Sequence, residues 1–146
     1  MKTDPKARYQ GYTFFFKEGF RWSAINGTRS TNDLKFCYKG KSVNDVQGMS
    51  LYCATDLISS QYITAICNAD FISKYTEAFV NHTVIFQIND CRQIPIIIPD
   101  KATNTVFTSL FEEAKSVVIL DANTHVKKLE MIKGKLDKLV MQLYHL

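Results

Sequence analysis

The residues best suited to binding chemistry are basic and aromatic side chains near the start of the chain. Between positions 17 and 41 the sequence has six Lys or Arg residues and only two acids, Glu18 and Asp33. Aromatic side chains are interleaved with them: Tyr9, Tyr12, Phe20, Trp22, Phe36 and Tyr38. The guanidinium of Arg fits the edge of guanine in the major groove, and both Lys and Arg pair with phosphates. The region is therefore compatible with a face that binds a polyanion.

A second interpretation of the same residues stays open. In β-rich domains, interleaved aromatic residues are commonly strand core and the basic residues a solvated face. Composition alone favours this structural interpretation. The middle of the chain, residues 57–100, is slightly acidic, so the basic character is confined to one end.

Motifs of self-contained enzymes are missing from the sequence. It has no phosphate-cradling loop, no Gly-x-Ser-x-Gly elbow and no Gly-x-Gly-x-x-Gly. The three histidines are isolated, and the neighbouring Glu112 and Glu113 point in different directions on a helix. Four widely spaced cysteines form no Cys-x-x-Cys pair and are expected to be reduced thiols rather than metal ligands. We therefore predict no catalytic residue and no metal site.

Length and composition are those of a soluble globular protein. The chain has 146 residues, a net charge of +4, 46% apolar residues and 22% charged residues. No apolar run reaches the roughly 18 residues that cross a bilayer. The first residues lack the apolar stretch of an export signal, so we expect a cytoplasmic protein without a membrane partner.

The elements that would position the basic face are predicted from hydrophobic periodicity. Strands are expected at 12–16 and 20–24, as a hairpin, and at 34–38, 49–53, 84–86 and 94–98, the last buried on both faces. A helix over 57–66 is expected to be capped by Thr55 or Asp56, and a second, capped by Asp70, to extend to residue 79.

After the proline-closed stretch 86–99 the period becomes helical. Apolar residues over 106–118 form one stripe, and those over 129–143 alternate three and four apart like a coiled-coil seam. We therefore predict an α/β fold of the α+β kind, with a strand-rich module and packed helices over residues 1–100. A C-terminal helical arm or hairpin over residues 101–146 is expected to pack on that module or on a neighbouring domain.

Five stretches carry a resemblance to a known family: Gly-Phe-Arg-Trp-Ser at 19–23, Lys-Ser-Val-Asn-Asp-Val-Gln-Gly-Met-Ser at 41–50, Tyr-Ile-Thr-Ala-Ile-Cys-Asn-Ala at 62–69, the whole of 86–99, and the closing residues 136–146. Together they resemble the target recognition domains of bacterial restriction–modification proteins. The similarity is to the C-terminal specificity domain of adenine-specific DNA methyltransferases of type IIG and BREX type, to which type I specificity subunits are related. Two departures are Asn44, where the family often has Phe, and Ile97, where proline is more usual.

The resemblance implies a division of labour. An α/β module would dock in the groove of double-stranded DNA, while a methyltransferase catalytic domain of the parent chain takes the flipped adenine. The helical arm would pack on that catalytic domain or on a second copy. The family's catalytic Asn-Pro-Pro-Tyr and methyl-donor site are absent here, so no cofactor is expected in this chain and S-adenosylmethionine is expected in the parent's catalytic domain.

Charge and loop position suggest which side chains would touch DNA under that interpretation. Salt-sensitive phosphate contacts would anchor the module, and a few loop residues would read base edges. Arg92 is expected to have a structural role, as an ion pair with Asp90 or as a cap. The base-contact candidates are Arg21, Arg29 and Asn32, and the phosphate-contact candidates are Lys17, Lys35, Lys39 and Lys41.

Two other classes of function remain. The chain could be a protein–protein interaction module that assembles through its helical arm while its basic face is incidental. It could also be a nuclease or methyltransferase with unrecognised catalytic residues, although no carboxylate–Lys cluster or donor-binding loop is visible. DNA binding that is absent or insensitive to salt, together with stable self-association, would favour the interaction module. Methyl transfer to DNA or cutting of DNA by the chain would favour the enzyme.

Overall fold

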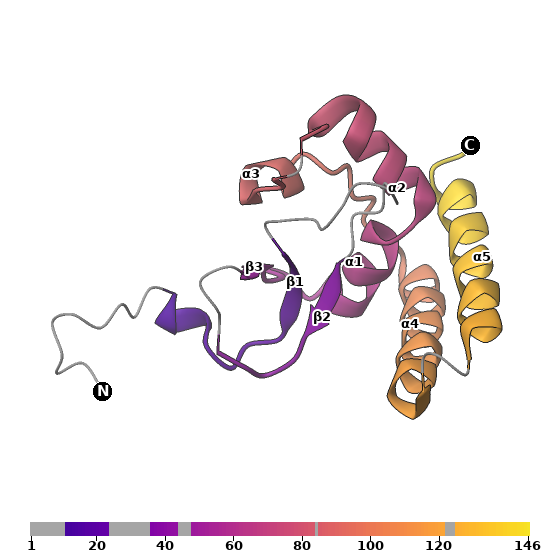
Figure 1. Cartoon of the computed structure of the whole chain (residues 1–146), viewed down its shortest axis with the longest axis horizontal. Coiled ribbons are helices and arrows are strands. Elements are labelled where there is room, and N and C mark those ends of the chain that lie inside the picture. Colours follow the sequence, from indigo (N-terminus) through magenta and orange to yellow (C-terminus); the bar gives the residue numbers. More distant parts are fainter. Residues whose placement is uncertain (1–10, 24–35, 44–47, 84, 122–124) are drawn as a thin grey trace, which may run out of the picture.

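A three-stranded antiparallel sheet and a set of helices packed on one of its faces make up the fold in a computed structural model (Figure 1). The structure describes residues 11–23, 36–43, 48–83, 85–121 and 125–146. In the described sheet, β1 (Gly19–Ser23) lies between β2 (Cys37–Lys39) and β3 (Gly48–Leu51). The predicted mixed α/β class with packed helices is confirmed.

The central strand forms because its apolar and polar residues alternate. Phe20 and Trp22 are buried, whereas Arg21 and Ser23 are exposed. The two rings meet Phe36 and Phe86 in an aromatic cluster, with ring centroids 5.5–6.1 Å apart. The Trp22 indole also donates a hydrogen bond of 2.9 Å to the Phe86 carbonyl, which satisfies its buried N–H.

The predicted hairpin at the start of the chain is wrong. Tyr12–Phe14 is a 3-10 turn, η1, and β1 pairs with β2 and β3 instead. The aromatic run is held by side-chain packing, because the Phe14 ring stacks on Tyr52 at 5.0 Å. The Phe16 N–H donates to the carbonyl of Ser42, which ties this segment to the turn after β2.

Two helices follow the sheet, but the predicted caps are wrong. α1 (Ser60–Cys67) begins after Ser59, whose hydroxyl accepts from the Tyr62 N–H at 3.0 Å. α2 (Asp70–Tyr75) continues as the π-helical turn η3 (Thr76–Val80). Asp70 lies in the first turn of α2 rather than capping it, and its own N–H is capped by Asp137 at 2.9 Å.

The apolar stretch after α2 is not the predicted pair of strands. Residue 84 lies outside the described residues, and α3 (Ile88–Cys91) begins with a capping box between Gln87 and Asp90. Residues 94–100 run without sheet pairing, since Pro95 and Pro99 have no N–H to donate. Two carbonyls of this segment accept hydrogen bonds from side chains instead. The Tyr62 hydroxyl donates to the Ile97 carbonyl at 2.7 Å, and the Tyr144 hydroxyl donates to the Pro95 carbonyl.

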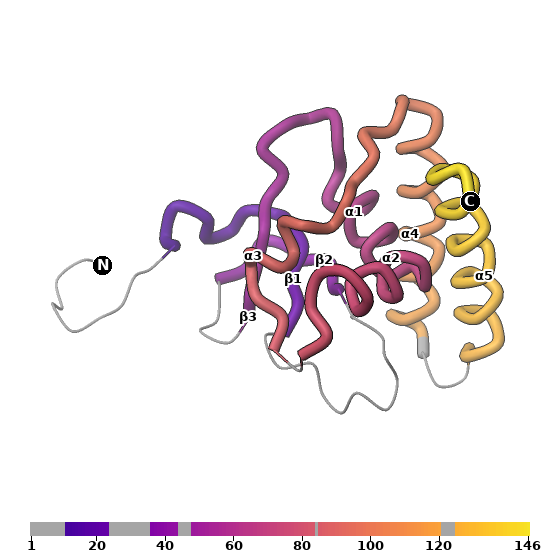
Figure 2. The backbone as a smooth tube through the Cα atoms, turned by 90° about the horizontal axis from the view of Figure 1, so that it is seen from above, coloured from indigo at the N-terminus to yellow at the C-terminus, as the bar shows by residue number. Residues whose placement is uncertain are grey.

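The last third is a helical hairpin of α4 (Lys101–Asp121) and α5 (Val126–Leu143). The two helices lie side by side in both views (Figures 1 and 2). The Phe107 ring meets Tyr62 edge-on at 5.2 Å, which packs α4 on α1. Leu136 and Val140 belong to the same core cluster as Phe20 and Trp22. The seam of α5 therefore faces the rest of the described chain.

A polar clamp fixes α5 to α2. The Lys133 ammonium bonds the carboxylates of Asp70 and Asp137, the second at 3.2 Å. Burial lowers the pKa of Lys133, but these two hydrogen bonds outweigh it, so its pKa is raised. No helix in the described part of the chain combines the length and the apolarity of a membrane span.

Candidate nucleic-acid interface

Arg21 occupies the middle of the sheet face that points away from the helices. It lies on the central strand, opposite Cys37 of β2 and Ser50 of β3. Directly opposed residues project from the same face, so the three form a row across the sheet. The described ion pairs belong to Lys115 and Lys133, and the exposed guanidinium of Arg21 is directed to solvent.

The side chains of this outer face are small on one side of Arg21, whereas Lys39 and Tyr52 flank Gly19 on the other side. Ser23 is opposite Gly48, one pair further along, and it shares the face with the row through Arg21. Cys37 and Ser23 are exposed, and Ser50 and Gly48 are half-buried. Arg21 is therefore a long cationic side chain with a platform of small residues, formed by Cys37, Ser50, Ser23 and Gly48, in its own row and on one side of it.

Packing explains the residue types in the stretch 19–23, one of those that resemble the family. A Cβ on Gly19 would lie 2.4 Å from the carbonyl oxygen of Leu51 and 2.9 Å from the ring of Tyr52. Only glycine fits this close approach. Phe20 and Trp22 fill the core, which leaves Arg21 as the one long side chain the motif presents outward.

Lys39 was predicted to contact a phosphate, but its side chain is buried, with 3% of its surface exposed. Its ammonium donates to the carbonyls of Lys17, Gly40 and Ser42 at 2.9–3.3 Å, which uses all three of its protons. The ring of Tyr52 lies 5.5 Å from the same nitrogen. We therefore assign Lys39 to the packing of the turn rather than to DNA.

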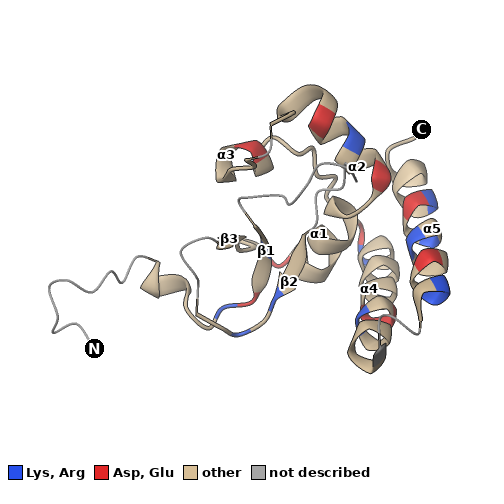
Figure 3. Cartoon of the chain, in the orientation of Figure 1, with Lys and Arg blue, Asp and Glu red and all other residues tan. Residues whose placement is uncertain are grey.

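Lys17 and Lys41 are exposed and lie at the same end of the sheet as this turn. Figure 3 shows basic residues, in blue, in the segments that lead into β1 and out of β2. The Lys17 ammonium lies 5.5 Å from the ring of Phe14. Lys39 lies on the outer face, opposite Gly19, and its ammonium bonds the Lys17 carbonyl and the carbonyls of Gly40 and Ser42 on both sides of Lys41. The exposed Lys17 and Lys41 therefore border the outer face. Arg29, Asn32 and Lys35 lie outside the described residues.

The predicted pairing of Arg92 with Asp90 is wrong. Asp90 accepts from the Gln87 N–H at 2.8 Å and from the amide of Asn81 at 2.7 Å, as part of the cap of α3. Arg92 is exposed and donates to Asn89 at 3.2 Å. The aspartate caps the start of α3, and Arg92 is the residue that caps its end, where the Arg92 N–H donates to the Ile88 carbonyl at 3.1 Å. The ion pair is therefore wrong, whereas the capping alternative agrees with the structure.

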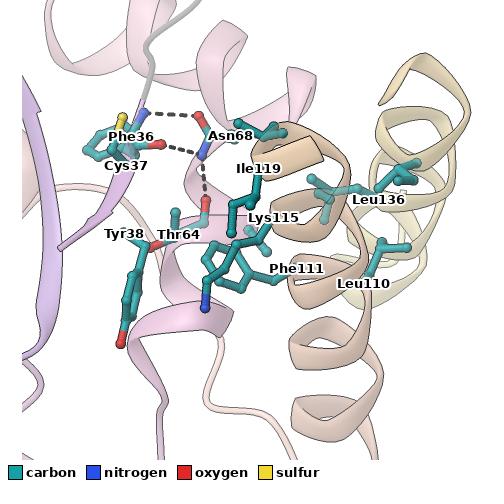
Figure 4. A pocket seen from close by; sticks show the side chains of 14 residues that line it. Phe36, Cys37, Tyr38, Thr64, Asn68, Leu110, Phe111, Lys115, Ile119 and Leu136 are labelled. Atoms are coloured by element: carbon teal, nitrogen blue, oxygen red, sulfur yellow. Dashed lines mark hydrogen bonds between the residues drawn. The ribbon is translucent and has the colours of Figure 1, made fainter. Parts of the chain in front are cut away.

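Sequence reasoning missed a groove of about 560 Å³ between β2, α1 and the hairpin (Figure 4). Its walls are mostly apolar and include Phe36, Phe111 and Leu136. Asn68 closes one end by accepting from the Phe36 N–H at 3.0 Å and donating to the Phe36 carbonyl at 2.8 Å. In the sequence, the one signal for the groove was Asn68, which lies in the stretch 62–69 that resembles the family.

Ionisable groups near the groove and core are held neutral. Burial, followed by a hydrogen bond with Glu18, raises the pKa of Tyr38 to about 12. Burial raises the pKa of the Cys91 thiol to about 12 and that of Cys67 well above its usual value. Both thiols are protonated at neutral pH and are therefore poor nucleophiles.

Among the described residues, no group of three or more His, Cys, Asp and Glu side chains could hold a metal ion. No protein-family model matches the chain, and no curated protein is similar enough to match it.

Proposed function

We propose that this chain is the sequence-specific DNA recognition domain of a restriction–modification adenine methyltransferase. It docks on double-stranded DNA in the cytoplasm, while a separate catalytic domain of the parent chain holds S-adenosylmethionine and methylates the base. The family resemblance in stretches 19–23 and 86–99 supports this proposal. The outer sheet face also supports it, because the cationic side chains of Arg21, Lys17 and Lys41 are exposed there.

The observation that carries the proposal is the exposed Arg21 at the centre of the sheet. A guanidinium can make two parallel hydrogen bonds to guanine, a contact that Lys cannot reproduce as a planar fork. Lys17 and Lys41, exposed together at one end of the same sheet, would contact phosphates next to the bases that Arg21 reads. Phosphate contacts orient the duplex and base contacts select the sequence.

The test is a titration of labelled duplex DNA with the chain at a series of salt concentrations. Replacing Lys17 or Lys41 by Met should reduce the slope of log affinity against log salt by about 0.9 each, without changing sequence preference. Arg21→Ala should cost about 1–3 kcal/mol on the preferred sequence and relax the preference at one position. Affinity that is independent of salt, or a preference that Arg21→Ala leaves intact, would contradict the proposal.

A protein–protein interaction module is the second candidate, and the helical hairpin favours it. Ile119 and Leu120 near the end of α4 are 73% and 76% exposed, and Val118 lines the apolar groove. In the parent protein this end of the hairpin would pack on the catalytic domain or on a second copy. Stable self-association without DNA binding would favour this second function over the first.

A further inference from the structure

We infer that the outer face of the sheet lies directly on the DNA, with Arg21 entering the major groove and the small residues Cys37 and Ser50 bringing the backbone close to it. This inference rests on the proposed function. It adds a contact surface that charge did not predict, because neither Cys37 nor Ser50 carries a charge.

The dimensions of the row agree with a groove. Neighbouring strands are about 4.8 Å apart, so the Cα atoms of Cys37, Arg21 and Ser50 span about 10 Å across the sheet. The major groove of B-DNA is about 12 Å wide and 8.5 Å deep. Arg21, in the middle of the row, is the side chain that is long enough to reach the base edges.

The surroundings of the row explain why a bulky ligand can approach. Ser23 and Gly48 continue the platform of small residues on one side of the row. On the other side Lys39 and Tyr52 flank Gly19, so the duplex would approach the strand over the side of Ser23. The opposite face of the same strands is filled by Phe20 and Trp22 and covered by helices. Of the outer face, the row through Arg21 and the pair of Ser23 and Gly48 therefore form the part that a partner would meet, because Lys39 beside Gly19 is buried.

Charge selects DNA as that partner. Arg21 stands at the centre of the face and Lys17 and Lys41 at its border, which together complement a polyanion. The nearest described acid in the sequence, Glu18, makes a hydrogen bond with the Tyr38 hydroxyl.

Thiol protection tests the inference in the full chain. Cys37 is exposed, whereas Cys67 and Cys91 are buried, so N-ethylmaleimide should label Cys37 first, as measured by mass spectrometry of the digest. A short random-sequence duplex is added at about ten times its Kd, which leaves roughly one chain in eleven free, and the labelling rate of Cys37 should fall about tenfold.

A matched pair of variants locates the protected surface. Cys37 also borders the groove beside α4, so a thiol is moved to the far side of the row by Ser50→Cys in a Cys37→Ser background. The control moves it to the exposed Ser116 of α4 by Ser116→Cys in the same background. DNA should protect the thiol of the Ser50→Cys variant about tenfold and leave that of the Ser116→Cys variant unprotected.

The outcomes separate the inference from the proposed function. Protection of both sheet positions supports the inference. DNA binding seen by fluorescence anisotropy, with labelling of both positions unchanged, overturns the inference and leaves the recognition function standing. Absence of DNA binding by the unmodified chain overturns both.

Discussion

Replacing the buried Lys39 by Met should destabilise the fold and leave the salt dependence of DNA binding unchanged. The Lys39 ammonium bonds three carbonyls of the segments on either side of β2, those of Lys17, Gly40 and Ser42. A hydrogen bond to a charged group contributes about 1.5–3 kcal/mol, and the thioether of Met can replace none of the three. Because the acceptor residues are at the surface, water would restore part of the loss, so we expect about 2–4 kcal/mol in the free energy of unfolding.

Urea denaturation followed by Trp22 fluorescence measures this change, because that indole is buried beside the sheet. Lys41→Met is the matched control: it removes the same charge two residues away from an exposed side chain and should change stability by less than about 0.5 kcal/mol. Equal stability of the Lys39→Met and wild-type chains would refute the structural role of Lys39. A reduced salt slope of DNA binding in Lys39→Met would refute its exclusion from the phosphate contacts.

Three further predictions concern stability. Gly19→Ala should cost about 1–3 kcal/mol in urea denaturation, because the new methyl group meets backbone, whereas Gly40→Ala, where nothing lies within 4 Å, serves as control. Asp137→Ala removes the cap of α2 and should cost about 1–2 kcal/mol, and a midpoint equal to wild type would contradict the clamp. Burial raises the pKa of Tyr144 to about 12 and that of Tyr62 further, so stability should fall as pH rises above 10, where the unfolded phenols ionise first. Unfolding midpoints that stay constant from pH 9 to pH 12 would contradict this burial.

The helical parts of the fold followed from periodicity, because a long stripe of apolar residues has few other solutions. The seam over 129–143 predicted α5, in which Ile132, Leu136 and Val140 are buried and the last two belong to the core cluster. The β-type residues around Phe20 and Trp22 likewise predicted a strand, although its place at the centre of the sheet was not predicted. These segments are long or strongly patterned, so local sequence alone determined their type.

The wrong predictions occurred where tertiary contacts overrode local propensity. The isoleucines between Pro95 and Pro99 look like a buried strand, but the prolines prevent a ladder and the carbonyls bond tyrosine hydroxyls. The aromatic run at 12–16 has high strand propensity, yet stacking of Phe14 on Tyr52 holds it as a turn.

The candidate site was only partly predictable for a related reason. A lysine count treats Lys17, Lys39 and Lys41 alike, and only the fold reveals that Lys39 is buried while its neighbours are exposed. Small residues such as Cys37 and Ser50 carry no signal of their own. Their significance comes from the register that sets them on either side of Arg21.

The most direct test of the account is selection from a randomised duplex library by the isolated chain at two salt concentrations, with the bound fraction sequenced. The account predicts a short enriched motif, weaker binding at the higher salt, and loss of enrichment at one position in Arg21→Ala. Salt-sensitive binding without enrichment would contradict sequence recognition by this chain. No binding at either concentration would contradict the DNA-binding function itself.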